Sequence, residues 1–499
     1  MTRTPKRILN SIADIKRYFA QNELAYYFIS ASNFNLMGMH EWVRNWQNIN
    51  LVDCFDGQHP QVLIVEDDHA QVFESIEDIN LYLLNNPRTH ALLNGPQGKD
   101  QARGRAIFLF FDEQLEALCE ALKLGIVLPN NRLVREIDSK IVTTEIGNQV
   151  NVHSVPNVLA KISSYASLRQ VAQEAGLGER WVVQTAYGDS GKTTFFIACE
   201  ADYDKVAEKI ESEDMVKAMR WINCAGTAIE ACATRWGTFV GPLLTELIGI
   251  DSLTPYPGGW CGNELYDAAF SADIRRQVLR KTQAIGDALY RRGYRGYFEL
   301  DYLLDLDTGE VYLGELNARI TGISAMTNMS DFSAEHIPLF LFHLLEYAPE
   351  IDLTLDVDAF NQAMLADGAA GIAAQMILKY TDDPLKIVTQ APVSGVYGLD
   401  ADGRLVLQRT GYNRRDALAE NEAYVLRIMS AGEYAYQGGD LAIMFINRII
   451  RQPQGKLNPV GELWVSALKH CFQFRQLNQE ERSLVELRRN PANVKSGRE

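Results

Sequence analysis

Two carboxylates, a carboxamide and an arginine stand close together in the segment YFELDYLLDLDTGEVYLGELNAR. The turn residues between its two apolar halves predict a hairpin, with Asp301 on the first strand and Glu315 and Asn317 on the second. Residues two apart on a strand share a face, and pairing brings Asp301 opposite them. Three hard oxygen donors on one face suit a Mg²⁺ ion that holds a nucleoside triphosphate. Arg319, two residues further on, would then hold a transferring phosphoryl group.

An exposed acidic strand with solvated charges is the alternative interpretation of this hairpin. The apolar residues on both sides of ELNAR favour a partly buried site instead. Glu299, two residues before Asp301, is either a neighbouring ligand or an ion-pair partner for Arg295.

A glycine-rich turn at residues 187–194, YGDSGKTT, is the second signal. Its small residues expose backbone amides that can hold phosphates, and Lys192 adds a positive charge. The P-loop pattern needs glycine where Ala186 stands, and a helix where the β-like TFFIAC follows. We therefore predict a phosphate-covering loop between two strands, with a plain hairpin turn as the alternative.

Composition narrows the class of protein. The 499 residues include 48 Lys and Arg against 64 Asp and Glu, a net charge of −16, which disfavours general nucleic-acid binding. No apolar run is long enough to span a membrane, and the N-terminus lacks the pattern of a secretory signal. Seven scattered cysteines without a CxxC pair fit reduced thiols. We expect a cytoplasmic enzyme with small-molecule substrates and no nucleic-acid or membrane partner.

The elements that position these residues change in type along the chain. Strands and helices alternate at first, with a strand at 25–30, a helix at 39–46 and a strand at 105–111, which predicts a mostly parallel sheet. Antiparallel strands follow, then helices at 272–293 and 333–347, and finally short strands with glycine turns. The fold class is therefore α/β and α+β. MVKAM at 215–219 is interpreted as a core strand rather than as a biotin-attachment site.

The order of elements over roughly residues 105–330 resembles the ATP-grasp superfamily, especially its biotin-carboxylase-like and carboxylate–amine ligase branches. The hairpin GYRGYFELDYLL…GEVYLGELNARITG is the most specific part of the resemblance. It implies an N-terminal parallel-sheet, pre-ATP-grasp domain at 1–135, an ATP-grasp domain at 136–350 and a C-terminal mixed domain at 351–499. The ATP-grasp domain would divide into a glycine-loop lobe at 136–235 and a metal-binding lobe at 236–350.

The resemblance also implies the roles of individual residues. Lys140 and the loop from Gly188 to Thr194, with Ser190, Gly191, Lys192 and Thr193, would contact the nucleotide phosphates. The adenine-hinge strand matches Met219, Arg220, Trp221 and Ile222, and the ribose-contacting acid matches Glu230. Asp301, Glu315 and Asn317 would hold Mg²⁺ or Mn²⁺, and Arg319 and Lys192 would be catalytic. The segment 255–263, PYPGGWCGN, is either a structural loop or one that approaches the substrates.

Two positions depart from the family pattern. Gln184 stands where a lysine or arginine is usual on the strand before the glycine loop, and Ile323 replaces the glutamate that serves biotin carboxylases as a base. We therefore expect an ATP-dependent carboxylate–amine ligase that acts through an acyl phosphate, and a homodimer is compatible with the family. A biotin-carboxylase-like enzyme acting through carboxyphosphate and a non-catalytic nucleotide-binding protein are the alternatives.

Overall fold

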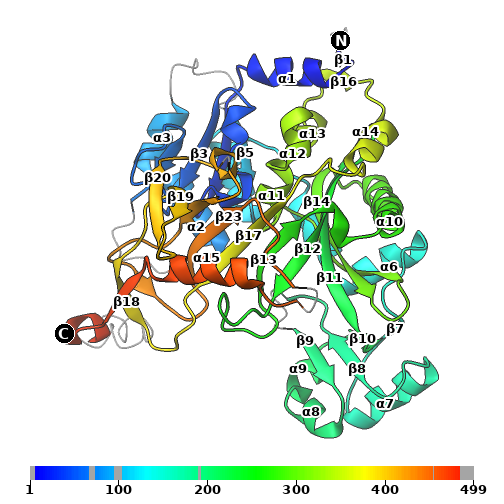
Figure 1. The fold of residues 1–499 in the computed structure, drawn as a ribbon. Coiled ribbons are helices and arrows are strands. Elements are labelled where there is room, and N and C mark those ends of the chain that lie inside the picture. Colours follow the sequence, from blue (N-terminus) through cyan, green and yellow to red (C-terminus); the bar gives the residue numbers. More distant parts are fainter. Residues whose placement is uncertain are drawn as a thin grey trace, which may run out of the picture.

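A parallel sheet with strand order β4-β3-β2-β5-β6 forms the N-terminal part of the chain (Figure 1). The computed structural model describes residues 6–66, 73–94, 104–188, 193–417, 419–452 and 455–483. The strands are β2 (Tyr26–Ser30), β3 (Trp46–Asn50), β4 (Val62–Ile64), β5 (Arg105–Phe108) and β6 (Gly125–Ile126). The helices of this part are α1 (Ile12–Ala20), α2 (Ile76–Asn85), α3 (Pro87–Leu93) and α4 (Glu113–Ala121). The alternation of strands and helices in the sequence thus gives the parallel sheet that it predicts.

The predicted helix at 39–46 is wrong. The structure has a short 3₁₀ turn at Met39–Glu41, and strand β3 already begins at Trp46. Gly38 and Asn45 have φ angles of 82° and 64°, in the left-handed region that ends right-handed helices.

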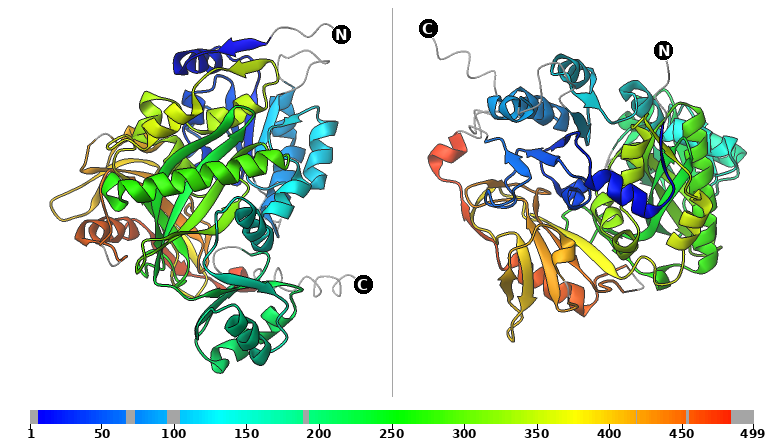
Figure 2. Two further views of the ribbon diagram at one scale, coloured as in Figure 1. Left: turned by 90° about the vertical axis from the view of Figure 1, so that its right-hand side faces the viewer. Right: turned by 90° about the horizontal axis from the view of Figure 1, so that it is seen from above.

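A small lobe, made of residues 157–188 and 193–220, projects from the rest of the molecule (Figures 1 and 2). Its antiparallel sheet has the order β7-β10-β8-β9. The elements are β7 (Asn157–Ala160), α7 (Tyr165–Glu174), β8 (Trp181–Gln184), β9 (Thr194–Ile197), α8 (Glu200–Asp204), α9 (Ala207–Glu211) and β10 (Val216–Arg220). Helices α5 (Asn131–Ile137) and α6 (Lys140–Gln149) connect the parallel sheet to this lobe.

A large antiparallel sheet runs through the remainder of the chain in the order β15-β14-β11-β12-β13-β17-β23-β21-β19-β20. Its first strands are β11 (Cys224–Thr234), β12 (Gly237–Ile248), β13 (Trp260–Leu265), β14 (Gly296–Asp305) and β15 (Val311–Asn317). Its later strands are β17 (Ala373–Lys379), β19 (Gly395–Leu399), β20 (Leu405–Arg409), β21 (Glu422–Arg427) and β23 (Asp440–Ile446). The pairing of β13 with β17 makes one continuous sheet of these two groups.

Helices cover this sheet and close its core. Helix α10 (Ala272–Arg291), predicted as 272–293, packs Val278, Ile285 and Leu289 onto the apolar residues of β11 and β12. The single helix predicted at 333–347 is instead two, α12 (Asp331–Glu335) and α13 (Phe340–Glu346). Pro338 lies between them and cannot continue a helix, because it lacks a backbone N–H. The other helices are α11 (Ser324–Asn328), α14 (Val357–Met364) and α15 (Pro459–Lys469).

Two small sheets complete the fold. Strand β1 (Arg7–Leu9) pairs in parallel with β16 (Ile351–Leu353), so the start of the chain is joined to its middle. Strands β18 (Lys386–Gln390), β22 (Tyr434–Ala435) and β24 (Gln473–Gln476) form the other. Within the described ranges, no helix is both long and apolar enough to cross a membrane.

Candidate active site

The predicted hairpin is confirmed and is formed by β14 and β15. Its register places Asp301 opposite Glu315 and Glu299 opposite Asn317, so these four side chains share one face of the sheet. The Nδ2 atom of Asn317 donates to Oδ2 of Asp301 at 3.4 Å, and Nη2 of Arg319 donates to Oδ1 of Asn317 at 3.0 Å. Asp301, Asn317 and Arg319 therefore form one hydrogen-bonded row, and Glu315 lies beside it, opposite Asp301.

Lys140 links this row to the glycine-rich turn. It is the first residue of α6, its side chain is 3% exposed, and its Nζ donates to Oε1 of Glu315 and to the carbonyl of Gly188, both at 2.9 Å. Its backbone N–H donates to the carbonyl of Ala186 at 2.8 Å. A buried cation is thus held between the turn before β9 and the carboxylates of β14 and β15.

A cavity of about 660 Å³ lies beside the row, between the small lobe and the large sheet. Six of the predicted residues line it: Gln184, Gly188, Asp301, Glu315, Asn317 and Arg319. From the segment 255–263, Gly258 and Trp260 also reach its wall. Its volume falls within the range of about 300–1,000 Å³ that small-molecule sites occupy. We name this space the large cavity.

Carboxylates gather around the large cavity beyond those that the sequence predicted. Burial and neighbouring carboxylates raise the pKa of Asp301 and Glu246 well above their ordinary values, and burial raises that of Glu299 to about 8. Glu299 is therefore a neighbour of the row, whereas Arg295 pairs with Glu346. This concentration of acids favours a divalent cation, because a cation stabilises the ionised forms.

The donor types also suit such an ion. Asp301, Glu315 and Asn317 present carboxylate and carboxamide oxygens, which hard divalent cations prefer. Among the described residues, no group of three or more His, Cys, Asp and Glu side chains is close enough to hold a metal. The row therefore fits a cation that shares its ligands with nucleotide phosphates rather than one held by protein alone.

Lys217 on β10 is a buried lysine near this site, with Glu315 and Lys140 as its charged neighbours. It lies directly opposite Gln184 of β8, and both alternate with residues that face the core of the small lobe. Its side chain is fully buried, its Nζ donates to Oγ of Ser154 at 2.9 Å, and burial lowers its pKa to about 7. In the sequence, Lys217 is a lone lysine in the apolar segment MVKAM, a pattern that predicts a core strand.

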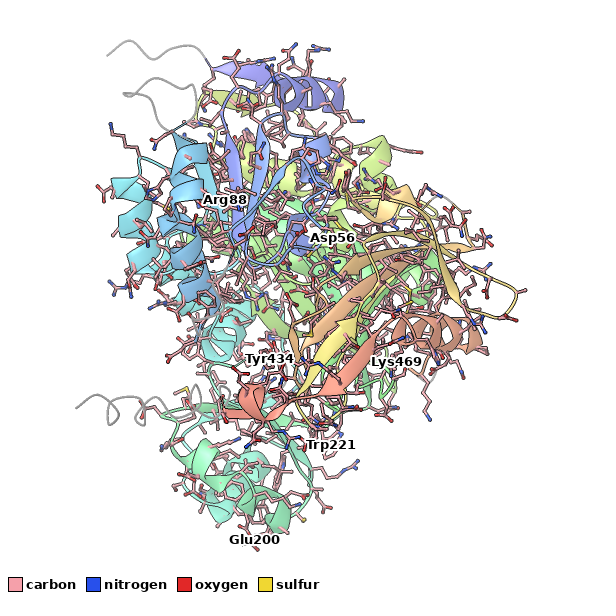
Figure 3. All side chains as sticks on the ribbon, turned by 90° about the vertical axis from the view of Figure 1, so that its left-hand side faces the viewer. Asp56, Arg88, Glu200, Trp221, Tyr434 and Lys469 are labelled. Atoms are coloured by element: carbon pink, nitrogen blue, oxygen red, sulfur yellow. The ribbon has the colours of Figure 1, made fainter. Side chains whose placement is uncertain are left out.

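The predicted adenine hinge lies at the end of β10. Arg220 is exposed and donates to the carbonyl of Gly176 at 2.9 Å, and the ring of Trp221 packs 5.1 Å from that of Phe196. Figure 3 shows Trp221 where the small lobe meets the rest of the molecule. Met219, rather than Arg220, Trp221 or Ile222, lines the large cavity. Thr193 lies against Gly188, whose Cβ position would be 2.1 Å from the Thr193 hydroxyl.

Glu230 does not occupy the position expected of a ribose ligand. Its carboxylate is fully buried on β11 and accepts hydrogen bonds from Tyr297 at 2.5 Å, from Thr321 at 3.2 Å and from Ser324. Burial raises its pKa to about 7. These hydroxyl groups already bind the carboxylate, and Glu230 does not line the large cavity, so the predicted ribose contact does not fit. Ser190, Gly191 and Lys192 lie outside the described residues.

Other residues of the site had no recognised signal in the sequence. Phe110 and Asp138 come from the segments after β5 and before α6, and Glu246 is a single acid in the apolar strand β12. An isolated charge in an apolar strand was the one pattern that could have identified Glu246. Phe110 and Asp138 are brought to the site by tertiary packing alone.

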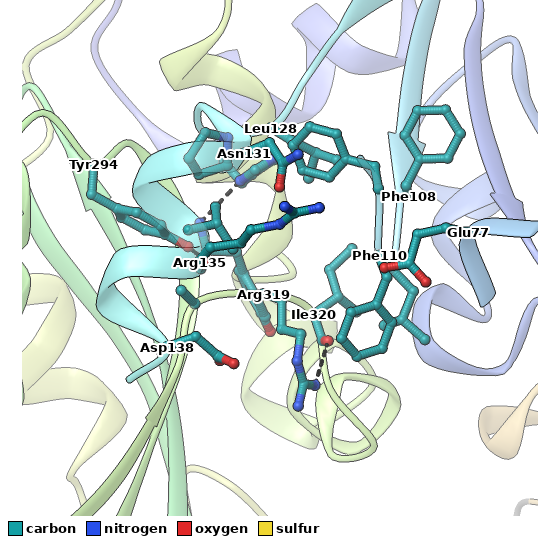
Figure 4. A pocket seen from close by; sticks show the side chains of 17 residues that line it. Glu77, Phe108, Phe110, Leu128, Asn131, Arg135, Asp138, Tyr294, Arg319 and Ile320 are labelled. Carbon is teal, nitrogen blue, oxygen red and sulfur yellow. Dashed lines mark hydrogen bonds between the residues drawn. The ribbon is translucent and has the colours of Figure 1, made fainter. Parts of the chain in front are cut away.

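A second, smaller cavity of about 100 Å³ adjoins the large one (Figure 4). Phe110, Asp138 and Arg319 line both cavities, so they form the boundary between them. The guanidinium of Arg319 lies 4.7 Å from the centre of the Phe110 ring. Arg319 thus faces the row of Asp301 and Asn317 on one side and a mostly apolar space on the other.

No protein-family profile and no curated protein sequence matches this chain, but solved structures share its fold. The biotin carboxylase domain of Hydrogenobacter thermophilus 2-oxoglutarate carboxylase, solved with MgADP, ADP and bicarbonate, has a TM-score of 0.57 at 10% identity, covering 92% of each chain. An ADP complex of N5-carboxyaminoimidazole ribonucleotide synthetase has a TM-score of 0.54 at 12% identity, covering 90% of this chain and 97% of that one. The Thermotoga maritima phosphoribosylamine–glycine ligase has a TM-score of 0.54 at 10% identity, covering 91% and 98%. The chain has the ATP-grasp fold.

The ATP-grasp fold confirms the resemblance that the sequence suggested, along with the predicted fold class. The similarity covers at least nine-tenths of each chain in these three comparisons, so it is a likeness of whole chains. Sequence identities of 10–12% support a shared fold only. The substrates of this chain must therefore be inferred from its own residues.

Proposed function

We propose that this chain is an ATP-dependent ligase that joins a small carboxylic acid to an amine and releases ADP and phosphate. The observation that carries the proposal is the position of Arg319, which lines both cavities beside Asn317. A guanidinium at this boundary can stabilise a phosphoryl group as it passes from a nucleotide on one side to a carboxylate on the other. The solved structures with MgADP, ADP and ATP support nucleotide use by this fold.

In this proposal the nucleotide occupies the large cavity. Lys140 binds its phosphates together with the turn at Gly188, Thr193 and the residues 190–192, of which Lys192 is the catalytic cation. The backbone at Arg220, Trp221 and Ile222 holds the adenine, and Gln184 offers a buried Oε1 that lacks a hydrogen-bond partner. Glu230 has no part in it.

Asp301, Glu315 and Asn317 would hold Mg²⁺ or Mn²⁺, which when bound neutralises phosphate charge. The protein's contribution is to position the reactants and to stabilise charge. A carboxylate oxygen of the acid attacks the γ-phosphorus, the bond from that phosphorus to the bridging oxygen breaks, and ADP leaves. Arg319 stabilises the charge on the transferred group, and the product is an acyl phosphate.

The second step needs a base, because an amine arrives as ammonium. Asp138 lines both cavities, and burial raises its pKa above the ordinary value, which makes its carboxylate a better proton acceptor. Asp138 takes one proton from the ammonium, the freed amine nitrogen attacks the acyl carbon, and phosphate leaves with the C–O bonding electrons and takes up the second proton. An amide, ADP and phosphate result.

Ile323 is the observation against the carboxylase alternative. It is 2% exposed and lines the large cavity, where it cannot remove a proton from bicarbonate. A non-catalytic nucleotide-binding protein is the other alternative. The connected row of Asp301, Asn317 and Arg319 argues against it, since simple nucleotide binding does not need a phosphoryl-stabilising arginine at a cavity boundary.

The test is a hydroxamate assay with MgATP, hydroxylamine and a panel of carboxylic acids, with and without bicarbonate. An acyl phosphate reacts with hydroxylamine to give a hydroxamate, so we expect acid-dependent hydroxamate and ADP that bicarbonate does not increase. Bicarbonate-stimulated ADP release without hydroxamate would favour the carboxylase, and nucleotide binding without any turnover would favour the non-catalytic protein. We further propose a cytoplasmic enzyme with small-molecule substrates, and a homodimer as its assembly.

A further inference from the structure

The smaller cavity beside Arg319 has a mostly apolar surface, which five charged or amide side chains also reach. Phe108, Phe110 and Phe111 contribute from the end of β5, Leu128 from the segment before α5, and Ile320 from the residue after Arg319. The carboxyl ends of parallel strands are the usual place for ligands in open α/β sheets. An apolar lining of this kind matches the carbon skeleton of a ligand rather than a nucleotide phosphate.

Two buried polar atoms on this wall lack a partner, and both are N–H donors. Asn131 is 3% exposed and lines the cavity, yet its Nδ2 has no hydrogen-bond partner. The Nε of Arg319 is likewise buried without a partner. Unpaired buried donors are costly, so the group that they lack is an acceptor. Figure 4 shows both side chains around the same space.

The charges around the cavity limit that acceptor further. Arg319 supplies positive charge from within the wall, whereas Arg135, which also lines the cavity, is exposed and ion-paired with Glu113 at 3.4 Å. Glu77 and Asp138 also line the wall and would repel a second carboxylate. One anionic group facing Arg319, with an apolar body, is therefore the best match.

The size of the cavity limits the apolar body. Its volume of about 100 Å³ is smaller than the ~150 Å³ of an apolar protein cavity that holds benzene. A branched aliphatic chain of about five carbons fits such a space better than a fused ring or a long chain.

We infer that the smaller cavity binds the carboxylic acid substrate, a short branched monocarboxylic acid whose carboxylate faces Arg319 and whose carbon chain packs between Phe108, Leu128 and Ile320. This assignment rests on the proposed ligase function for its reaction, but binding can be measured without turnover. Asn131 supplies a hydrogen bond to the bound acid. Arg319 holds the carboxylate at the boundary from which it reaches the nucleotide.

The experiment is isothermal titration of the full chain, in the presence of ADP and Mg²⁺, with 3-methylbutanoate. Two matched probes are 3-methylbutylamine, which has the same chain with a cationic head, and glutarate, which has two carboxylates. The variants are Leu128→Trp, which fills the cavity, and Asn131→Asp, which removes the donor with little change of shape. Arg132→Gln, exposed on the same helix, is the control.

We expect 3-methylbutanoate to bind the wild type and Arg132→Gln equally, and to bind Leu128→Trp and Asn131→Asp at least tenfold more weakly. ADP affinity should stay unchanged in all variants. No binding of 3-methylbutanoate, equal binding by both cavity variants, or tighter binding of the amine or of glutarate would overturn the assignment. If Leu128→Trp does not fold, Asn131→Asp decides alone.

The hydroxamate assay separates this inference from the proposed function. Hydroxamate formation with bulky acids, and with no effect of the two variants, would keep the ligase and refute the cavity assignment. Binding of 3-methylbutanoate that the variants weaken, without hydroxamate from any acid, would keep the site and refute the ligase.

Discussion

The Nζ atom of Lys140 lies 2.9 Å from Oε1 of Glu315, so a buried lysine at the start of α6 is ion-paired with a carboxylate of the candidate metal site. Both groups have a different partner in the proposed complex, since Lys140 would bind phosphate and Glu315 would bind the cation. Nucleotide and metal therefore replace one ion pair by two, and neither side chain is left buried without a counter-charge.

Glu315→Gln should lower turnover by roughly 100-fold or more, because a neutral amide holds a divalent cation less strongly than a carboxylate does. The measurement is phosphate release at saturating ATP. Glu310→Gln, an exposed site on the same hairpin, is the matched control and should behave as wild type. Wild-type turnover in a folded Glu315→Gln protein would remove Glu315 from the metal site.

Lys140→Met should weaken ATP binding by about tenfold or more, since a charge-assisted hydrogen bond contributes about 1.5–3 kcal/mol. The dissociation constant of ATP, measured by titration, tests this. Lys205→Met changes a lysine that is 72% exposed on the small lobe and should leave the constant unaltered. Equal ATP affinity of Lys140→Met and wild type would contradict the phosphate contact.

Gly322→Ala should reduce turnover through Trp260. A Cβ atom at position 322 would lie 2.3 Å from Cη2 of Trp260, so the ring, which lines the large cavity, must move. Adding Trp260→Leu should restore part of the activity by making room. Gly258→Ala, on the same cavity wall with no atom within 4 Å of the new Cβ, is the control. If Gly322→Ala is fully active, the position of Trp260 does not matter for turnover.

Glu230→Gln should change how stability depends on pH. The pKa of Glu230 is about 7 in the fold and 4.5 ordinarily, so the folded state retains a proton that the unfolded state releases. Its stabilising contribution is complete below about pH 4.5 and is lost as the pH rises through 7. The free energy of unfolding should therefore fall between pH 5 and 8 by about 3 kcal/mol more in wild type than in Glu230→Gln. Urea unfolding across this pH range measures the difference. An equal pH dependence of the free energy of unfolding in both proteins would contradict the raised pKa of Glu230.

The sequence was most informative where local pattern alone determines structure. The turn between Asp301 and Glu315 gave the hairpin, because turn residues and alternation fix the pairing of neighbouring strands. The helix expected at 333–347 failed where Pro338 interrupts it. The ribose role predicted for Glu230 does not fit its burial. That burial depends on hydrogen bonds from Thr321 and Ser324, which come from a segment far along the chain.

The smaller cavity could not be predicted for the same physical reason. Its walls come from the end of β5, from α5 and from the residues after β15, which packing brings together across long stretches of chain. A single sequence contains the residue types, such as Asn131 and Phe108, but no periodicity that relates them. The continuity of the large sheet through β13 and β17 was likewise not apparent, since those strands pair at long range.

The pairing of β13 with β17 affects when the large sheet can form during protein synthesis. On β17, Gln375 donates from Nε2 to the carbonyl of Gly322 at 2.8 Å, so a late strand fixes the backbone beside the large cavity. During synthesis, the edge of β13 that pairs with β17 stays unpaired until residue 373 has been made, because Leu265 pairs with Ala373. Nascent chains that stop before residue 373 would expose that edge to other strands. Strand β17 thus supports a cavity whose lining residues, up to Ile323, all precede it in the sequence.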